Sequence, residues 1–169
     1  MEEQIMNMPA VALRGLTILP GMIAHFDISR ERSLRAVEEA MEQDQKIYLV
    51  TQRNVDSEDP TQEDLYQMGI VADIKQVVRL QNDVVRILVD GISRAALLGF
   101  TDNEKYLEAE ICYCDSNADS LPEDLREAML LGVREAFHRY AAVVGKISKE
   151  LIRQIDQYED LEKLIDYVT

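Results

Sequence analysis

The chain has 169 residues and a formal net charge of −14, and 47% of its residues are hydrophobic. That apolar fraction is ordinary for a globular protein and sufficient for a real core. The negative charge argues against nucleic acid as a ligand and against an anionic membrane surface as a partner, because both need basic residues. No apolar run approaches the length needed to span a bilayer.

Cysteine usage and the N-terminal residues indicate the compartment. Cys112 and Cys114 are separated by one residue, a spacing that suits a disulfide poorly and supplies at best half of a metal site. Residues 1–4 are acidic and lack the basic segment that begins a signal peptide. We therefore expect two reduced thiols, a cytoplasmic protein, and no metal or other cofactor in this chain.

The most apolar run of the chain covers residues 11–28 and is interrupted at two points. Gly15 can adopt a positive φ, and Pro20-Gly21 is typical of a turn. Short apolar segments on either side predict two strands joined by a bend. Partial alternation marks the second strand at Met22, Phe26 and Ile28.

Residues 29–42 predict a helix with Ser29 as its N-cap, because small and apolar side chains recur at helical spacing. The apolar stripe of this helix is Leu34, Ala36, Val37, Ala40 and Met41. Residues 46–51 are rich in β-formers and predict a buried strand. Residues 54–64 form an acidic loop without the central glycine of a calcium site, and Thr61–Asp64 predicts a capped turn at its end.

Two long β-rich runs follow, over residues 70–80 and 84–98. Residues 81–83 between them are turn formers, so the pattern predicts a hairpin. Gly91 interrupts the second arm, where a bulge or bend would let one long strand serve two sheets. Clean alternation over residues 106–113 predicts a strand with one solvent-facing side.

The composition changes at residues 115–119, which predict a linker. A capping box at Ser120–Glu123 is expected to begin a long helix that ends at Gly145. Shorter helices are expected over residues 148–157 and 159–168. Apolar residues spaced by three and four mark the face of the long helix: Leu125, Met129, Val133, Ala136, Phe137, Tyr140 and Val144.

The domain organisation predicted from these elements is a β-rich domain over residues 1–114 followed by a helical subdomain over residues 115–169. The last predicted helix has an apolar face that needs a partner, yet no stop signal follows it. We therefore expect the chain to be a fragment of something longer.

Catalytic motifs are missing from the sequence. It contains no Walker-type glycine loop and no Gly-x-Ser-x-Gly elbow, and the two histidines, His25 and His138, stand alone. The positive signal is apolar surface, since residues 11–28 carry more large apolar side chains than a small sheet edge needs. These residues are either core, which sequence alone favours, or a binding surface: Leu16, Ile18, Leu19, Pro20, Met22 and Ile23.

Five segments carry a combined signal when they are taken in order: residues 13–22, 29–41, 60–72, 84–95 and 160–166. Together they resemble the N-terminal substrate-recognition domain of the bacterial Lon-family ATP-dependent proteases. The match covers essentially the whole chain, and its motifs are specific only in combination.

The resemblance implies an α+β fold, with a β-rich, PUA-like pseudo-barrel followed by a helical bundle that is truncated before an AAA+ module. It implies capture of unfolded or damaged proteins, assembly into a homohexamer, and delivery of substrates to a motor that uses ATP and Mg and to a Ser-Lys peptidase. Neither the motor nor the dyad lies in these residues, so this chain should bind and not hydrolyse. The alternatives are a free-standing protein of the same domain family with a regulatory or small-ligand role, and an enzyme using an unrecognised acid pair, for which no residue argues.

Overall fold

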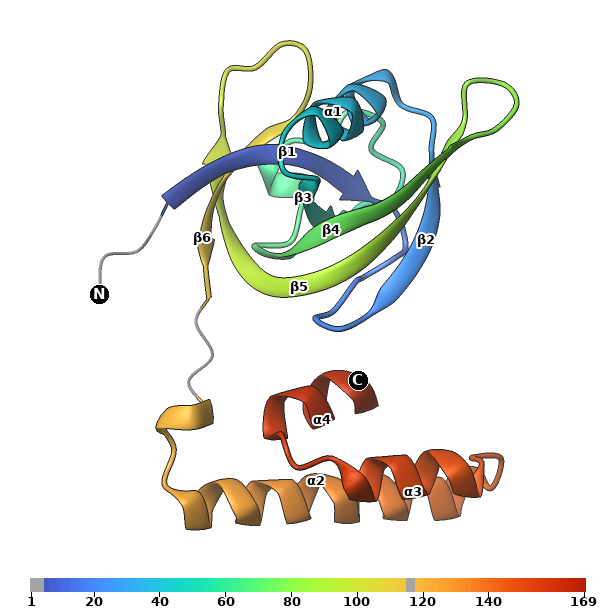
Figure 1. Ribbon diagram of the computed structural model, residues 1–169, viewed down its shortest axis with the longest axis vertical. Coiled ribbons are helices and arrows are strands. Elements are labelled where there is room, and N and C mark those ends of the chain that lie inside the picture. Colours follow the sequence, from blue (N-terminus) through green and yellow to red (C-terminus); the bar gives the residue numbers. More distant parts are fainter. Residues whose placement is uncertain (1–4, 115–117) are drawn as a thin grey trace. The chain divides into compact units, whose positions relative to one another are not determined.

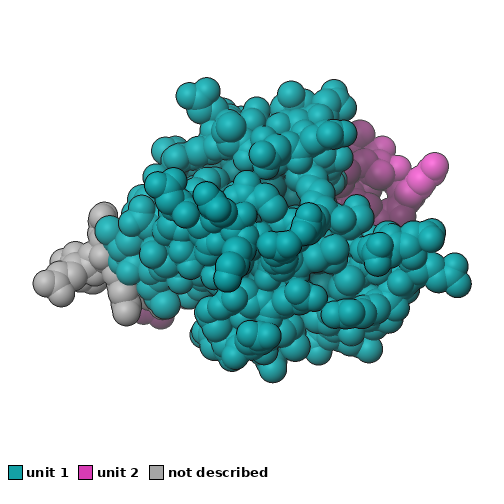
Figure 2. Space-filling view, turned by 90° about the horizontal axis from the view of Figure 1, so that it is seen from above, with its two compact units in different colours: residues 1–114 teal, residues 115–169 magenta. Residues whose placement is uncertain are grey.

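A computed structural model describes residues 5–114 and 118–169 of the chain (Figure 1). The chain divides into two compact units, residues 1–114 and residues 115–169, which Figure 2 colours separately. Each unit has hydrophobic clusters of its own. Residues 115–117 of the expected linker lie outside the described ranges.

The first unit is built from six strands in the sheet order β2-β5-β4-β3-β1-β6. An additional pairing between β5 and β6 joins the sheet to itself, so that β2 alone lies outside the ring of paired strands. β1 and β3 are parallel, and the other pairs are antiparallel. The strands are β1 (Ile5–Leu13), β2 (Ile23–Ile28), β3 (Lys46–Thr51), β4 (Met68–Arg79), β5 (Val85–Phe100) and β6 (Glu108–Tyr113).

The long strand β5 serves two neighbours along the same edge. Residues 85–90 of β5 pair with β2, and residues 95–100 pair with β6. Between these halves the register with β4 shifts, so that Gly91 and Ser93 lie opposite consecutive β4 residues and Ile92 is the extra residue. The predicted interruption at Gly91 is therefore confirmed as a bulge.

The hairpin between β4 and β5 turns where the sequence predicts it. Asn82 and Asp83 both have a positive φ, of 60° and 58°, as the two central residues of a type I′ turn do. The N–H of Leu80 donates to the carbonyl of Val84 at 2.8 Å, which pairs the two arms next to the turn. Asn and Asp tolerate this left-handed conformation better than most residues, which is why the turn needs no glycine.

Helix α1 (Glu31–Glu42) packs on β1 and β3 with Ala36, Val37 and Ala40 buried. The prediction that Ser29 caps this helix is wrong, because Arg30 occupies the N-cap position and no side chain caps the helix there. Met41, expected in the apolar stripe, is exposed. Small residues dominate the buried face, so the helix backbone can lie close to the sheet.

The acidic loop after β3 ends in the short 3₁₀ helix η1 (Gln62–Asp64). The N–H and the hydroxyl of Thr61 both contact the carboxylate of Asp64, at 2.9 and 3.0 Å. These contacts confirm the predicted capped turn, and they hold the pKa of the Asp64 carboxyl below its usual value.

The second unit contains the 3₁₀ helix η2 (Ala118–Ser120) and the helices α2 (Glu123–Val144), α3 (Lys149–Gln157) and α4 (Leu161–Val168). Gly145 ends α2 in the left-handed conformation with a φ of 67°, as predicted. Ser148 caps α3 and Asp160 caps α4 through side-chain hydrogen bonds. The predicted capping box at the start of α2 is wrong, because Pro122 is its N-cap.

The face of α2 that packs is offset from the predicted one. Leu130, Val133 and Phe137 of α2 pack with residues of α3 and α4 in the cluster of the second unit. Ala141 of α2 is also buried. The predicted stripe includes Val133 and Phe137, but Leu125, Met129, Tyr140 and Val144 are exposed. Two apolar stripes run side by side on this helix, and α3 and α4 cover one of them. The α+β class, a β-rich pseudo-barrel followed by helices, is confirmed.

Candidate functional site

The segment between β1 and β2 folds as a tight turn around Pro20 and Gly21. The N–H of Met22 donates to the carbonyl of Leu19 at 3.1 Å, and Gly21 has a φ of 75°. Proline at the second position and a positive φ at the third define a type II turn. The predicted turn at Pro20-Gly21 is therefore confirmed.

This turn is fastened to β5 at the bulge. The N–H of Gly21 donates to the carbonyl of Gly91 at 2.7 Å, and the N–H of Gly91 donates to the carbonyl of Met22 at 2.9 Å. A Cβ atom on Gly91 would lie 2.3 Å from the carbonyl oxygen of Leu19. Gly91 is thus required for the close approach of the two backbones, as well as marking the bulge.

The six apolar residues singled out in the sequence fall into three environments. Ile18 is 5% exposed and belongs to the main cluster of the barrel, so it is part of the core. Leu16, Leu19 and Pro20 are half-buried. Met22 and Ile23 are 38% and 68% exposed. The six residues therefore do not form one surface: some belong to the core and others are exposed to solvent.

The solvent-facing side of β2 continues from this turn. Ile23, His25 and Asp27 are exposed, while Ala24 and Ile28 are buried. Arg86 of β5 donates two hydrogen bonds to the Asp27 carboxylate, at 2.6 and 2.8 Å. These bonds hold the pKa of the Asp27 carboxyl below its usual value, so the carboxylate stays ionised and paired.

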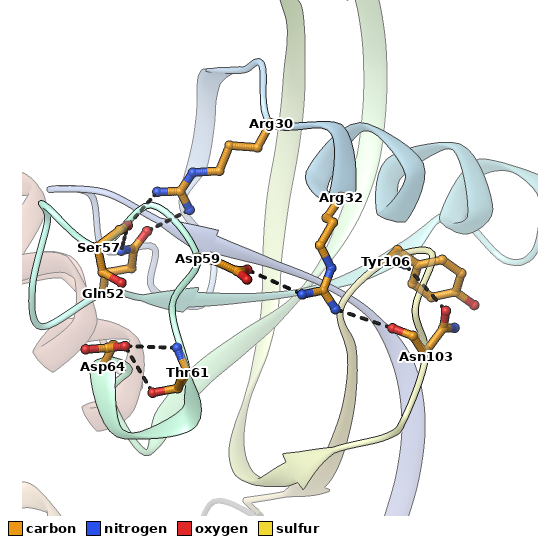
Figure 3. A network of polar contacts seen from close by, with 9 residues as sticks. All are labelled: Arg30, Arg32, Gln52, Ser57, Asp59, Thr61, Asp64, Asn103 and Tyr106. Carbon is orange, nitrogen blue, oxygen red and sulfur yellow. Dashed lines mark hydrogen bonds and ion pairs between the residues drawn. The ribbon is translucent and has the colours of Figure 1, made fainter.

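Arginine side chains hold the start of the same segment in place. Arg14 and Arg30 both donate to the carbonyl of Ser57, each at 3.0 Å. Arg30 also donates to the buried side chain of Gln52 at 3.0 Å (Figure 3). Burial, with the neighbouring Arg14 guanidinium, lowers the pKa of Arg30.

Arg32, in the first turn of α1, ties this helix to two loops: its guanidinium donates to the Asp59 carboxylate at 3.4 Å and to the carbonyl of Asn103 at 3.3 Å (Figure 3). The hydroxyl of Thr51 donates to the carbonyl of Leu16 at 2.9 Å. Sequence reasoning missed these anchoring residues, because an arginine that binds a backbone carbonyl has no spacing signature. Arg14 and Thr51 hold the segment from which the apolar turn projects, and Arg32 holds the start of α1.

A second apolar surface lies beside a shallow depression lined by Arg53, Leu65, Tyr66 and Leu97, among others. The Arg53 guanidinium lies 5.2 Å from the centre of the Tyr66 ring, a cation–π contact. Met68 is exposed nearby, with its sulfur 3.7 Å from the thiol of Cys114. The depression is open to solvent, and sequence reasoning did not single it out.

Several features bear on chemistry. Among residues 5–114 and 118–169, no three His, Cys, Asp or Glu side chains lie close enough together to hold a metal ion. Neither cysteine, both of which are described, forms a disulfide. His138 of α2 lies 2.8 Å from the Asp156 carboxylate of α3, a contact between two helices. No described helix is long and apolar enough to cross a membrane.

The chain belongs to the family of Lon substrate-binding domains, because the family model described as "ATP-dependent protease La (LON) substrate-binding domain" matches residues 7–169. The Lon protease of Lachnoclostridium phytofermentans is 36% identical over 169 residues, which is 100% of this chain and 21% of that protein. The Lon protease of Clostridioides difficile is 35% identical over 165 residues, covering 96% of this chain and 21% of that protein. The chain thus spans about a fifth of the length of these relatives.

Solved structures agree on the fold. The N-terminal domain of the Mycobacterium avium complex Lon protease superposes with a TM-score of 0.72 at 17% identity, over 95% of this chain and 80% of that one. A Lon N-terminal domain protein from Xanthomonas campestris gives a TM-score of 0.56 at 14% identity, over 96% of both chains. The resemblance inferred from the sequence motifs is therefore confirmed.

Proposed function

We propose that this domain captures unfolded or damaged polypeptides through the apolar turn and the adjoining end of β2, formed by Leu19, Pro20, Met22 and Ile23. The observation that carries the proposal is the exposure of Met22 and Ile23 on a turn that is rigidly held. Large apolar side chains held outward at a fixed site suit a surface that grips exposed apolar segments. The flexible thioether of Met22 adapts to side chains of different shape.

The proposal extends to the longer protein of which the relatives are examples. There the domain would hand bound polypeptide to an AAA+ motor, fuelled by ATP and Mg, and to a Ser-Lys peptidase, within a cytoplasmic homohexamer that serves protein quality control and the stress response. The identity with Lon proteases over the whole of this chain supports that role. The residues described here supply binding and positioning on this proposal, and the chemistry belongs to the other modules.

The direct test is binding of a labelled, permanently unfolded protein of near-zero net charge to the chain and its variants. Ile23→Glu places a charge at the centre of the proposed surface and should weaken binding by about tenfold or more, since a buried aliphatic side chain contributes roughly 1.5–3 kcal/mol. Fluorescence anisotropy gives the dissociation constant, and circular dichroism shows whether the fold is retained.

Leu131→Glu is the matched control, because Leu131 is 56% exposed on α2 of the other unit. This variant should bind the unfolded protein as the unaltered chain does. Equal weakening by both variants would contradict a localised surface. If Ile23→Glu folds normally and binds without loss, the apolar turn is not the binding site.

A further inference from the structure

β2 has one paired edge and one open edge. Within residues 5–114 and 118–169, β5 is the only strand that pairs with β2, and β2 stands last in the sheet order. An edge strand presents backbone N–H and C=O groups that can pair with another extended chain. The open edge lies beside the apolar turn, because Ile23 is the first residue of β2.

The register identifies the residues whose backbone groups point to the open edge. The N–H of Gly91 donates to the carbonyl of Met22, so the Met22 carbonyl points toward β5. Hydrogen bonding alternates along an antiparallel pair, so Ala24, Phe26 and Ile28 also face β5. Ile23, His25 and Asp27 therefore direct their N–H and C=O groups away from the sheet.

Two common protections of an edge strand, lysine and proline, are missing from β2. Natural edges often carry these residues or other charged side chains, which discourage pairing with a second strand. β2 reads Ile-Ala-His-Phe-Asp-Ile, and its one charged side chain is Asp27. Both Asp27 carboxylate oxygens are bonded to Arg86 of β5, so this charge is neutralised and drawn toward the paired side.

We infer that the open edge of β2 binds an extended segment of unfolded polypeptide as an added strand. The inference rests on the proposed function and supplies its binding mode. Main-chain pairing takes donors and acceptors that every polypeptide has, so it recognises an unpaired backbone regardless of sequence. A folded protein has its backbone groups already paired, so the same edge discriminates against it.

Side chains add preference to this main-chain pairing. Alternate residues of the added strand would lie on the same face as Ile23, which is exposed and apolar. The net charge of −14 favours segments that are neutral or basic. The occupant is therefore an extended segment with apolar residues at alternate positions and no excess of acidic residues.

The probe is a lysine-capped nonapeptide with leucine at alternate positions, mixed with the full chain. Amide hydrogen exchange should show Ile23, His25 and Asp27 exchanging fast in the free chain and slowed about tenfold or more by saturating peptide. The amides of Ala24 and Phe26, which face β5, should be protected in both states. A matched peptide that is N-methylated at alternate amides, on the edge that would face β2, keeps its side chains and loses the pairing. It should bind roughly tenfold more weakly.

A variant pair tests the same point from the other side. His25→Pro removes the edge N–H and leaves the ladder to β5 intact, whereas His25→Ala removes the side chain alone. His25→Pro should lose peptide affinity and His25→Ala should keep it. If His25→Pro does not fold, the exchange and N-methyl measurements on the unaltered chain decide the outcome.

The outcomes separate this inference from the proposed function. If both peptides bind equally and no edge amide gains protection, strand addition is overturned while capture by the apolar turn stands. If neither the peptide nor the unfolded protein binds, the proposed function fails, and the binding mode inferred from it fails too. Protection confined to Ile23, His25 and Asp27 would support both.

Discussion

At the scale of single residues, the apolar turn shows how two identical side chains come to have opposite roles. Ile18 and Ile23 lie in the same apolar run, yet one is core and the other is exposed. The difference follows from the turn being held against β5 at Gly91, which directs Ile18 into the barrel and leaves Ile23 outside. Neither hydropathy nor spacing distinguishes the two residues.

Gly91→Ala should destabilise the barrel by about 1–3 kcal/mol, because the new methyl group would lie against a backbone carbonyl that is held by hydrogen bonds. The midpoint of urea unfolding measures the change. Gly132→Ala is the control, since a Cβ there meets nothing within 4 Å and the residue lies inside α2. It should stabilise the helix by roughly 0.5–1 kcal/mol. A neutral Gly91→Ala would show that the turn can move away from β5.

The ion pair between Asp27 and Arg86 predicts a specific dependence of stability on pH. A carboxyl whose pKa is lowered by folding contributes stability above its unfolded pKa, and this contribution is lost as the pH falls through the folded value. Asp27→Asn should therefore be less stable than the unaltered chain at neutral pH, and the two should converge at pH values well below about 4. Urea midpoints at both pH values test this. A deficit that persists undiminished in acid would show that Asp27 acts through some other contact.

At the scale of elements, local sequence signals determine the turns and the end of α2, whereas neighbouring helices determine which face of α2 is packed. The hairpin turn, the type II turn and the end of α2 at Gly145 depend on backbone conformations that particular residues prefer, and all three were predicted. The packing face of α2 depends on which stripe its neighbours cover. Leu130 is buried because residues of α3 and α4 pack against it, and that arrangement leaves no trace in the sequence of α2 itself.

Asp83→Gly should stabilise the β4–β5 hairpin by up to about 1 kcal/mol, because Asp83 holds a positive φ that glycine adopts without steric cost. Asp83→Ala should be less stable than the unaltered chain, because alanine adopts the positive φ at this position less readily than aspartate does. Thermal unfolding of the three proteins gives the order. If alanine and glycine have the same effect, the turn conformation does not limit the stability of the hairpin.

At the scale of the whole molecule, the chain contains two units with separate cores. Ile87 is fully buried in the cluster of the first unit, and Ile155 is 1% exposed in the cluster of the second. The boundary near residue 114 coincides with the change of composition in the sequence. We propose that the two units fold independently, as expected when each has its own core.

This independence predicts separable effects of truncating one core residue in each unit. Ile87→Ala should destabilise the first unit, and Ile155→Ala the second, each by about 2–5 kcal/mol. The second unit is small, so Ile155→Ala should unfold it while the barrel stays folded. Residue-resolved amide exchange follows both units at once. A single transition that both substitutions shift equally would show one cooperative fold.

The sequence by itself determined the elements, the turns and the family, because these depend on local backbone preference, on alternation and on motifs in a fixed order. It left open which apolar residues are exposed, and it predicted the packing face of α2 and the first residues of α1 and α2 incorrectly. The tertiary structure decided these points, since they depend on what lies opposite: Gly91 behind the apolar turn, α3 and α4 over Leu130, and Gln52 and Ser57 around Arg30. The open edge of β2 likewise exists only once β5 has taken the other side.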